Sequence, residues 1–211
     1  LIGEVTIEPA LRAMEAAVAA LLLSSNPVIS VNGNVAALVP EEIVKLAEAV
    51  NAKLEVNLFY RSEDRVRKIA EILKAYGARE VLGIDDATAE IPELMSERRK
   101  VSPRGILVAD TVLVPLEDGD RTEALRRLGK TVIAIDLNPL SRTARAASIT
   151  IVDNVVRAVP KMIEYAQKLR TTSRKELSEI LRKYDNNLVL AEVLKHIKNR
   201  LEELARSNLL L

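Results

Sequence analysis

The segment VIAIDLNPLSRTARAASITIVDN, residues 132–154, contains two apolar, β-branched stretches that both end in polar side chains. The first ends at Asp136-Leu137-Asn138 and the second at Asp153-Asn154, with Arg142 and Arg145 between them. Short, continuously apolar stretches of this kind are typical of strands that are buried on both faces of a parallel sheet. The segment therefore predicts two neighbouring strands whose ends carry carboxylates, amides and nearby arginines.

The same alternation of strand and helix continues on the N-terminal side of this segment. Helices are expected at 6–24, 40–50, 63–76 and 121–128. Six strands are predicted in all, at 27–31, 53–60, 80–84, 111–120, 131–136 and 148–154. Strands that alternate with helices in this way predict an α/β fold, with a mostly parallel sheet covered by helices on both faces.

The chain beyond residue 155 has only helical patterns. Ser173 and Glu176 have the spacing of a capping box, which marks a helix start. The last helix, expected over 187–206, carries an apolar stripe at Leu190, Leu194, Ile197, Leu201 and Leu204. We therefore expect an α/β domain over 1–170 and a C-terminal helical extension over 171–211.

Composition excludes several functional classes. The 31 basic residues exceed the 30 acidic ones by one, which argues against a dedicated nucleic-acid surface. Four tyrosines, one phenylalanine and no tryptophan leave little for stacking bases. The absence of cysteine excludes disulfides, thiolate catalysis and zinc–thiolate sites. No apolar stretch approaches the roughly 20 residues of a membrane span, so the sequence predicts a cytoplasmic protein with no membrane partner.

A ligand site is expected at the carboxyl ends of the strands, where open parallel sheets bind their ligands. The strands are followed by Asn32-Gly33-Asn34, Tyr60-Arg61, Asp85-Asp86, the stretch 117–121, Asp136-Leu137-Asn138 and Asp153-Asn154. Any one of these ends is typical of a turn or a helix cap. The six ends together favour a site, because turns require neither arginines nor repeated acid–amide pairs.

Phosphate binding would need other groups than the usual glycine-rich loops. Neither Gly-x-Gly-x-x-Gly nor Gly-x4-Gly-Lys-Ser/Thr follows a strand. Arg142, Arg145 and the helix start near Asn154 are the first candidates for binding phosphate. Asn32-Gly33-Asn34 is the second, because such residues adopt the positive φ that turns backbone N–H groups toward an anion. A solvated loop is the alternative interpretation for the two arginines.

Acid–base groups are few. Asp118 and Asp120 have the spacing to hold magnesium, but Asp120 is equally well explained as the cap of a helix at 121. His196 is the single histidine, and it falls beside the apolar stripe of the last helix, where a surface position is expected. With no histidine placed to act as a general base and no cysteine, the chemistry that the sequence supports is the alignment of reactants and the neutralisation of their charge.

Three segments resemble a known family: VISVNGNVAALVPEEIVKLAEAVNAKLEVNLFYR, VPLEDGDRTEAL, and TVIAIDLNPLSRTAR with ITIVDNVVRAVP. They are similar to the archaeal phosphopantothenate synthetases, the 4-phosphopantoate–β-alanine ligases of coenzyme A biosynthesis, and the likeness extends from Leu1 to about Lys168. The resemblance implies a Rossmann-like, homodimeric enzyme whose nucleotide-binding catalytic domain is residues 1–170. It would couple 4-phosphopantoate to β-alanine through an acyl-adenylate, with release of AMP and diphosphate from ATP.

The resemblance also assigns site residues. The family binds its nucleotide with an Asp-Leu-Asn loop, an Arg-Thr pair and an Asn-Val step. ATP binding is thereby expected at Asp136, Leu137, Asn138, Arg142, Thr143, Asn154 and Val155. For the acyl substrate or magnesium, the hypothesis is Asn32, Gly33, Asn34, Asp118, Gly119, Asp120 and Arg121, with the metal on Asp118 and Asp120. No catalytic residue is assigned.

The family carries a helical arm ahead of the position matching Leu1, including a Gly-Arg-Gly segment whose arginine is linked to ATP. The sequence does not contain this arm. Either the arm is deleted, which would leave the ATP site incomplete, or it is omitted from the sequence and the enzyme is intact. Two other functions stay open: another adenylate-forming ligase on the same scaffold, and a non-catalytic nucleotide-binding or assembly module.

Overall fold

A six-stranded parallel sheet forms the centre of the molecule. The computed structural model describes residues 1–92, 94–116 and 118–207. The strands are β1 (Pro27–Val31), β2 (Lys53–Val56), β3 (Val81–Leu82), β6 (Thr111–Val114), β7 (Thr131–Ile135) and β8 (Ile149–Ile151). All neighbours pair in parallel, in the order β3-β2-β1-β6-β7-β8. The six predicted strands and the α/β fold are confirmed, and the strand order reverses between β1 and β6.

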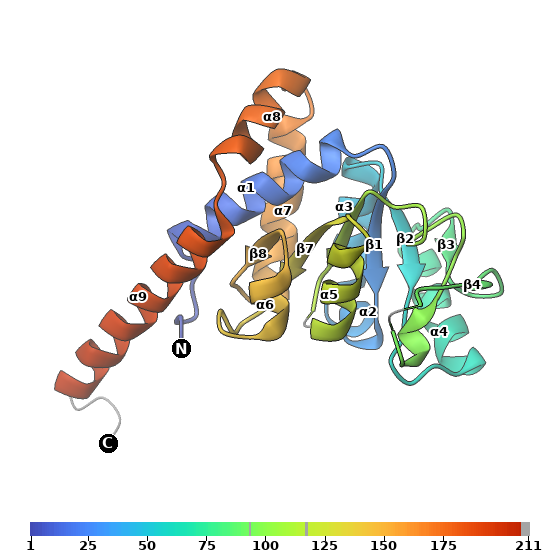
Figure 1. Ribbon diagram of the computed structural model, residues 1–211, viewed down its shortest axis with the longest axis horizontal. Helices are drawn as coiled ribbons and strands as arrows, with labels where there is room; N and C mark the ends of the chain where they lie inside the picture. Colours follow the sequence, from blue (N-terminus) through green and yellow to red (C-terminus); the bar gives the residue numbers. More distant parts are fainter. Residues whose placement is uncertain (93, 117, 208–211) are drawn as a thin grey trace.

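Helices cover both faces of the sheet, as predicted (Figure 1). The larger core lies under α1 (Glu8–Leu23), α3 (Pro40–Ala49), α4 (Glu63–Ala75) and α7 (Val155–Leu169). The smaller core lies under α5 (Gly119–Arg127) and a segment over 89–109. Side chains alternate between the two cores because successive residues of a strand point to opposite faces. On β1, for example, Ile29 packs into the larger core and Val28 into the smaller one.

Several short elements were not predicted. They are the helices α2 (Gly33–Leu38) and α6 (Arg142–Ala146), the antiparallel pair β4 (Ala89–Glu90) and β5 (Lys100–Val101), and a 3-10 helix, η1 (Glu97–Arg99). Elements of two to six residues are too short to show a helical or strand period. The strands predicted at 53–60 and 111–120 are also shorter in the structure, because the first ends at Val56, before Asn57, and the second ends at Val114, before Pro115.

The C-terminal helices are α8 (Arg174–Lys183) and α9 (Asn186–Arg206), with α6 (Arg142–Ala146) lying between β7 and β8. The capping box of Ser173 and Glu176 is present as predicted. The predicted apolar stripe of α9 is partly wrong, because its buried residues are Val189, Leu190, Val193 and Ile197. Leu194 and Leu201 are exposed, since α9 projects beyond the body of the molecule (Figure 1).

Side chains on both sides of residue 170, such as Met162 and Leu177, belong to one continuous core. The predicted boundary between an α/β domain and a helical extension stays a prediction. Among the helices that the structure describes, none is both long and apolar enough to cross a membrane.

Two glycines provide a matched test of the packing at the end of β3. Gly83 has a φ of +78°, and a Cβ there would lie far inside van der Waals contact of the Val56 carbonyl oxygen. Gly77 has a φ of +99°, but a Cβ there would meet nothing within 4 Å. We expect Gly77→Ala to lower the free energy of unfolding by about 1–2 kcal/mol, the cost of the left-handed conformation.

Gly83→Ala should cost a further ~1–3 kcal/mol, because the backbone must shift to admit the methyl group. Urea unfolding of both variants measures the difference. Equal losses would contradict this account of the contact between β2 and β3.

Candidate active site

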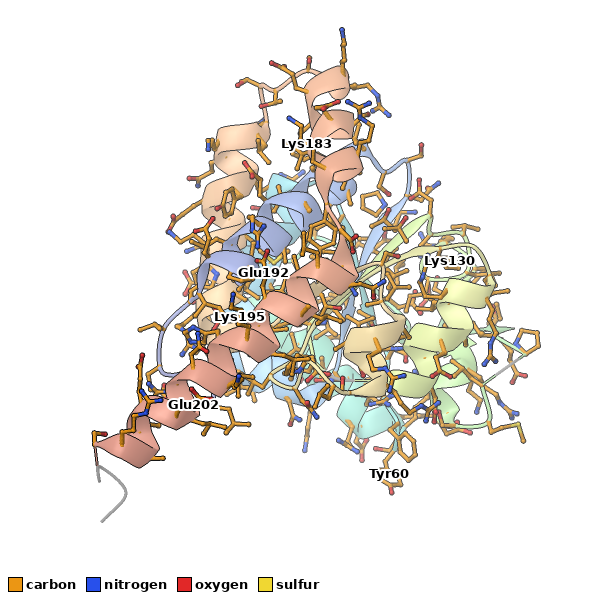
Figure 2. The ribbon with its side chains drawn as sticks, turned by 60° about the vertical axis from the view of Figure 1, so that its left-hand side comes forward. Tyr60, Lys130, Lys183, Glu192, Lys195 and Glu202 are labelled. Carbon is orange, nitrogen blue, oxygen red and sulfur yellow. The ribbon has the colours of Figure 1, made fainter. Side chains whose placement is uncertain are left out.

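The predicted site residues gather at one edge of the sheet, where the parallel strands end. Asn32, Gly33 and Asn34 follow β1, and Asp118 to Arg121 follow β6, so these two groups flank the point of strand-order reversal. The residues expected to bind ATP follow β7 and β8 on the same edge. Figure 2 shows Tyr60, which follows β2, at this end of the molecule, with Lys130 toward the opposite end of the sheet.

Two adjoining cavities open at this edge. The larger one, of about 480 Å³, is lined by Phe59, Leu94, Met95, Ser96, Asp120, Glu123, Arg127 and Arg142. The smaller one, of about 130 Å³, is lined by Asn32, Gly33, Asn34, Leu58, Phe59, Tyr60, Arg65 and Arg98. Phe59 lines both. A separate hollow of about 430 Å³ lies near the start of β2 and contains none of the predicted site residues.

Asp136 shapes the loop after β7. Its carboxylate accepts hydrogen bonds from the Asn138 N–H (2.8 Å) and from the Ser141 hydroxyl. The Asn138 side-chain oxygen accepts from the Leu140 N–H (3.0 Å), which tightens the turn further. Asp136 is buried, whereas Leu137 and Asn138 are exposed. The loop is therefore rigid without glycine, and it presents Leu137 and Asn138 at the edge of the sheet.

Thr143 and Arg142 join the two predicted groups of site residues. The Thr143 hydroxyl accepts a hydrogen bond from the Asp118 N–H (3.1 Å). Arg142 is paired with Asp120 (2.9 Å) and with Glu123 (3.0 Å) across the start of α5. The hydrogen bond from Arg142 lowers the pKa of Glu123, and the same bond raises the pKa of Arg142. Residues about 25 positions apart in the sequence thus form a single charged surface.

Asn154 begins helix α7, as the sequence predicted. Its side-chain oxygen accepts from the Val156 N–H (3.2 Å), so α7 starts at Val155. Asp153, by contrast, is buried, and its carboxylate is bound by other side chains of the protein. Its carboxylate accepts hydrogen bonds from Arg157 (2.5 Å) and from the Thr6 hydroxyl (2.6 Å). The Asn154 N–H donates to Asp153 (2.7 Å) and the Val156 N–H donates to Asn154, so the Val155 N–H is the backbone donor at the start of α7 that suits an anion.

A buried network of polar groups lies beneath the strand ends. Asp118 pairs with Arg98 (2.8 Å) through one oxygen and with Arg121 (2.9 Å) through the other. Arg121 is 1% exposed, and it donates hydrogen bonds of 2.6 Å to the Ser30 hydroxyl and to the Asn57 side-chain oxygen. Burial lowers the pKa of the Arg121 guanidinium, and the nearby Asp118 carboxylate opposes that shift. The network links β1, β2, α5 and η1.

Asp118 does not fit a magnesium ligand. Both of its oxygens face guanidinium groups, and it also caps α5 by accepting from the Arg121 N–H (3.4 Å). The predicted cap at Asp120 is therefore wrong, since the cap is Asp118 and α5 begins at Gly119. Within the described residues, no three His, Asp or Glu side chains are placed to hold a metal ion.

The positive φ expected at Asn32-Gly33-Asn34 is wrong. Among the described residues, the glycines with positive φ are Gly3, Gly77, Gly83 and Gly129, and the one other such residue is Asn51. Asn32 instead caps α2, with its side-chain oxygen accepting from the Val35 N–H (3.0 Å). These three residues line the smaller cavity through their side chains and the start of a short helix.

Sequence reasoning missed most of the residues that line the two cavities, among them Phe59, Arg65 and Arg98. Arg98 comes from η1, and its guanidinium carbon lies 5.1 Å from the centre of the Phe59 ring. The basic cluster Arg98-Arg99-Lys100, in a segment without helical or strand period, was the available signal. Arg61, which the sequence placed at a strand end, instead donates to the Gly83 and Ile84 carbonyl oxygens (2.8 and 2.9 Å).

Two other sequence candidates lie outside these cavities. Arg145 is exposed on α6 and lines neither cavity. His196 is half-buried rather than a surface residue, and its Nε2 lies 3.1 Å from the Ile2 carbonyl oxygen. Neither residue carries a role in the chemistry at this edge.

The comparisons with known proteins agree with this arrangement. The family model described as phosphopantothenate/pantothenate synthetase matches residues 9–200. The chain belongs to this family. A 4-phosphopantoate–β-alanine ligase of Thermococcus kodakarensis is 61% identical over 210 residues, which are 99% of this chain and 80% of that protein. A ligase of the same name from Methanosarcina mazei is 54% identical over 206 residues, or 97% of this chain and 80% of that protein.

In this member of the phosphopantothenate synthetase family, the buried carboxyl of Glu55 is one of the groups that hold the segment over 94–109 against the sheet. This side chain accepts hydrogen bonds from the Ser102 N–H (3.0 Å) and the Ile106 N–H (2.6 Å). Burial raises the pKa of Glu55 to about 7, although the two backbone hydrogen bonds oppose the shift. Since Arg98 belongs to this segment, Glu55 also helps to hold one wall of the smaller cavity.

The raised pKa of Glu55 predicts a pH-dependent stability. A carboxyl with a folded pKa of about 7 and an ordinary value of 4.5 stabilises the fold below pH 4.5, and this contribution is lost as the pH rises through 7. Gln cannot titrate, so the wild type should lose about 2–3 kcal/mol relative to Glu55→Gln between roughly pH 5 and pH 8. Urea unfolding across this range measures the difference, and a constant difference would contradict the prediction.

Proposed function

We propose that this protein condenses 4-phosphopantoate with β-alanine to 4′-phosphopantothenate in coenzyme A biosynthesis, with conversion of ATP to AMP and diphosphate. Two curated relatives with at least 54% identity over nearly the whole chain carry the name of this ligase. The observation that carries the proposal is the buried contact between Thr143 and Asp118, which connects the expected nucleotide residues to the expected acyl-substrate residues.

The reaction would proceed by two displacements. The carboxylate of 4-phosphopantoate attacks the α-phosphorus of ATP, and diphosphate leaves with the electrons of the broken P–O bond. The amine of β-alanine then attacks the acyl carbon of the adenylate, AMP leaves, and the nitrogen loses a proton. Neither step requires a protein nucleophile, which suits an edge whose side chains supply cations, amides and backbone N–H groups.

ATP would lie along the ends of β7 and β8. We assign Leu137 and Asn138, on the loop shaped by Asp136, to the nucleoside. The Val155 N–H at the start of α7, which Asn154 caps, is assigned to phosphate. Arg142 would bind a phosphate oxygen, supported by Thr143. Magnesium bound with ATP would neutralise phosphate charge, and Asp120 is the exposed carboxylate beside Arg142 that suits it.

Arg142 would have to exchange partners when ATP binds. It is held by Asp120 and Glu123, which keep its guanidinium at the edge of the larger cavity. A phosphate oxygen offers a stronger acceptor than an exposed carboxylate and can replace either one. The assembly as a homodimer and the location in the cytoplasm belong to the same proposal.

The activity is tested by incubating the protein with ATP, 4-phosphopantoate and a panel of amines while AMP is measured. We expect AMP and 4′-phosphopantothenate to form with β-alanine and not with other amines. AMP formation with a different amine would indicate another adenylate-forming ligase. ATP binding without any AMP would indicate a non-catalytic nucleotide-binding module.

Arg142→Ala tests the nucleotide site. We expect ATP to bind about 10- to 100-fold more weakly, because one charge-assisted hydrogen bond to phosphate is lost. Arg145→Ala is the matched control, since it removes an exposed arginine from the same short helix without touching either cavity. Calorimetric titration with ATP measures both, and equal affinities in the two variants would refute this role for Arg142.

A further inference from the structure

Among the residues that the structure describes, the buried network beneath the smaller cavity contains more positive than negative charge. The single carboxylate of Asp118 is shared by Arg98 and Arg121, whose side chains are 18% and 1% exposed. The next acidic group, Glu55, already accepts two backbone hydrogen bonds and has a pKa near 7. Because buried charges need partners, this excess positive charge favours a bound anion.

The smaller cavity is where such an anion would lie. Arg65 and Arg98 both line it, and none of the described residues that line it is acidic. Its volume of about 130 Å³ corresponds to roughly four water molecules at ~30 Å³ each, which suits a tetrahedral phosphate group. The polar side chains of Asn32, Asn34 and Tyr60 complete its lining.

Arg98 is held in place before any ligand arrives. Its guanidinium pairs with Asp118 (2.8 Å) and lies against the Phe59 ring. Its backbone carbonyl accepts a hydrogen bond of 3.1 Å from the Asn57 side-chain nitrogen. The other end of the Asn57 amide accepts from Arg121 (2.6 Å), so Asn57 ties η1 to the buried arginine. An arginine with so little freedom loses little entropy when it binds an anion.

We propose that Arg98 and Arg65 form the subsite for the phosphate group of the acyl substrate, and that Asp118, Arg121 and Asn57 are positioning residues for Arg98. The proposal rests on the proposed function and extends it, since it explains how the enzyme distinguishes 4-phosphopantoate from pantoate. Phe59 lines both cavities, so a substrate with its phosphate at Arg98 can extend its carboxylate into the larger cavity, which Arg142 lines.

Steady-state kinetics of Arg98→Gln and Arg65→Gln test the subsite, with Arg99→Gln as the matched control. Arg99 is the neighbouring residue in η1 and pairs with Glu90 instead of lining the cavity. We expect Arg98→Gln to raise the KM for 4-phosphopantoate about 10- to 100-fold and to change the KM for ATP less than about twofold. The preference in kcat/KM for 4-phosphopantoate over pantoate should fall by a similar factor, and Arg98→Lys should recover part of the loss.

Equal increases in the KM for ATP and for 4-phosphopantoate would overturn the proposal, because they would indicate a general disruption of the fold. An unchanged KM for 4-phosphopantoate in both Arg98→Gln and Arg65→Gln would also overturn it. Arg65 is an exposed residue of α4, so its variant keeps the test valid even if Arg98→Gln does not fold.

A binding experiment separates this proposal from the proposed function. Inorganic phosphate should raise the melting temperature of the wild type and of Arg142→Ala, but not that of Arg98→Gln or the Arg65→Gln variant. This result would support the anion subsite even if the wild type formed no AMP from 4-phosphopantoate and β-alanine. A phosphate-dependent increase that persists in Arg98→Gln and disappears in Arg142→Ala would place the anion at the nucleotide site and overturn the proposal.

Discussion

The sharing of the Asp118 carboxylate between Arg98 and Arg121 is the interaction on which the rest of the site depends. Arg121 extends under the strand ends to Ser30 and Asn57, while Arg98 extends outward to Phe59 and the smaller cavity. A buried ion pair that loses one partner leaves an uncompensated charge, which is strongly destabilising. The network therefore requires all three side chains at once, and it holds α5 and the 89–109 segment in one arrangement.

Under the proposed function, this arrangement would present an anion site on a doubly wound sheet without a glycine-rich phosphate loop. The Asp136 carboxylate binds the loop after β7 from within, and the start of α7 contributes a backbone N–H group. Arg98, Arg121 and Arg142 supply positive charge, and each is paired with a carboxylate in the structure. Such pairing orients the cations, and a phosphate group would have to replace a carboxylate.

Much of the fold follows from local patterns in the sequence. The six strands are short apolar stretches, and the helices between them have caps and apolar faces that local patterning reveals. The elements that escaped prediction are α2, α6, η1 and the β4–β5 pair, which are too short to show a period. The exposed residues Leu194 and Leu201 show a second limit of prediction from the sequence. The apolar stripe on α9 does not indicate how far along the helix the rest of the protein packs against it.

The sequence by itself determined the α/β class, the polar ends of the strands and the family to which the chain belongs. These features depend on residue type and spacing along the chain. The tertiary structure decided the partners of the charged side chains. It made Asp118 a buried cap between two arginines rather than a metal ligand, and it brought Arg98 and Arg65 to one cavity. These outcomes depend on the order of the strands and on the irregular segment that carries Arg98. Both bring together residues that are far apart in the sequence, so no local pattern could have indicated the contacts.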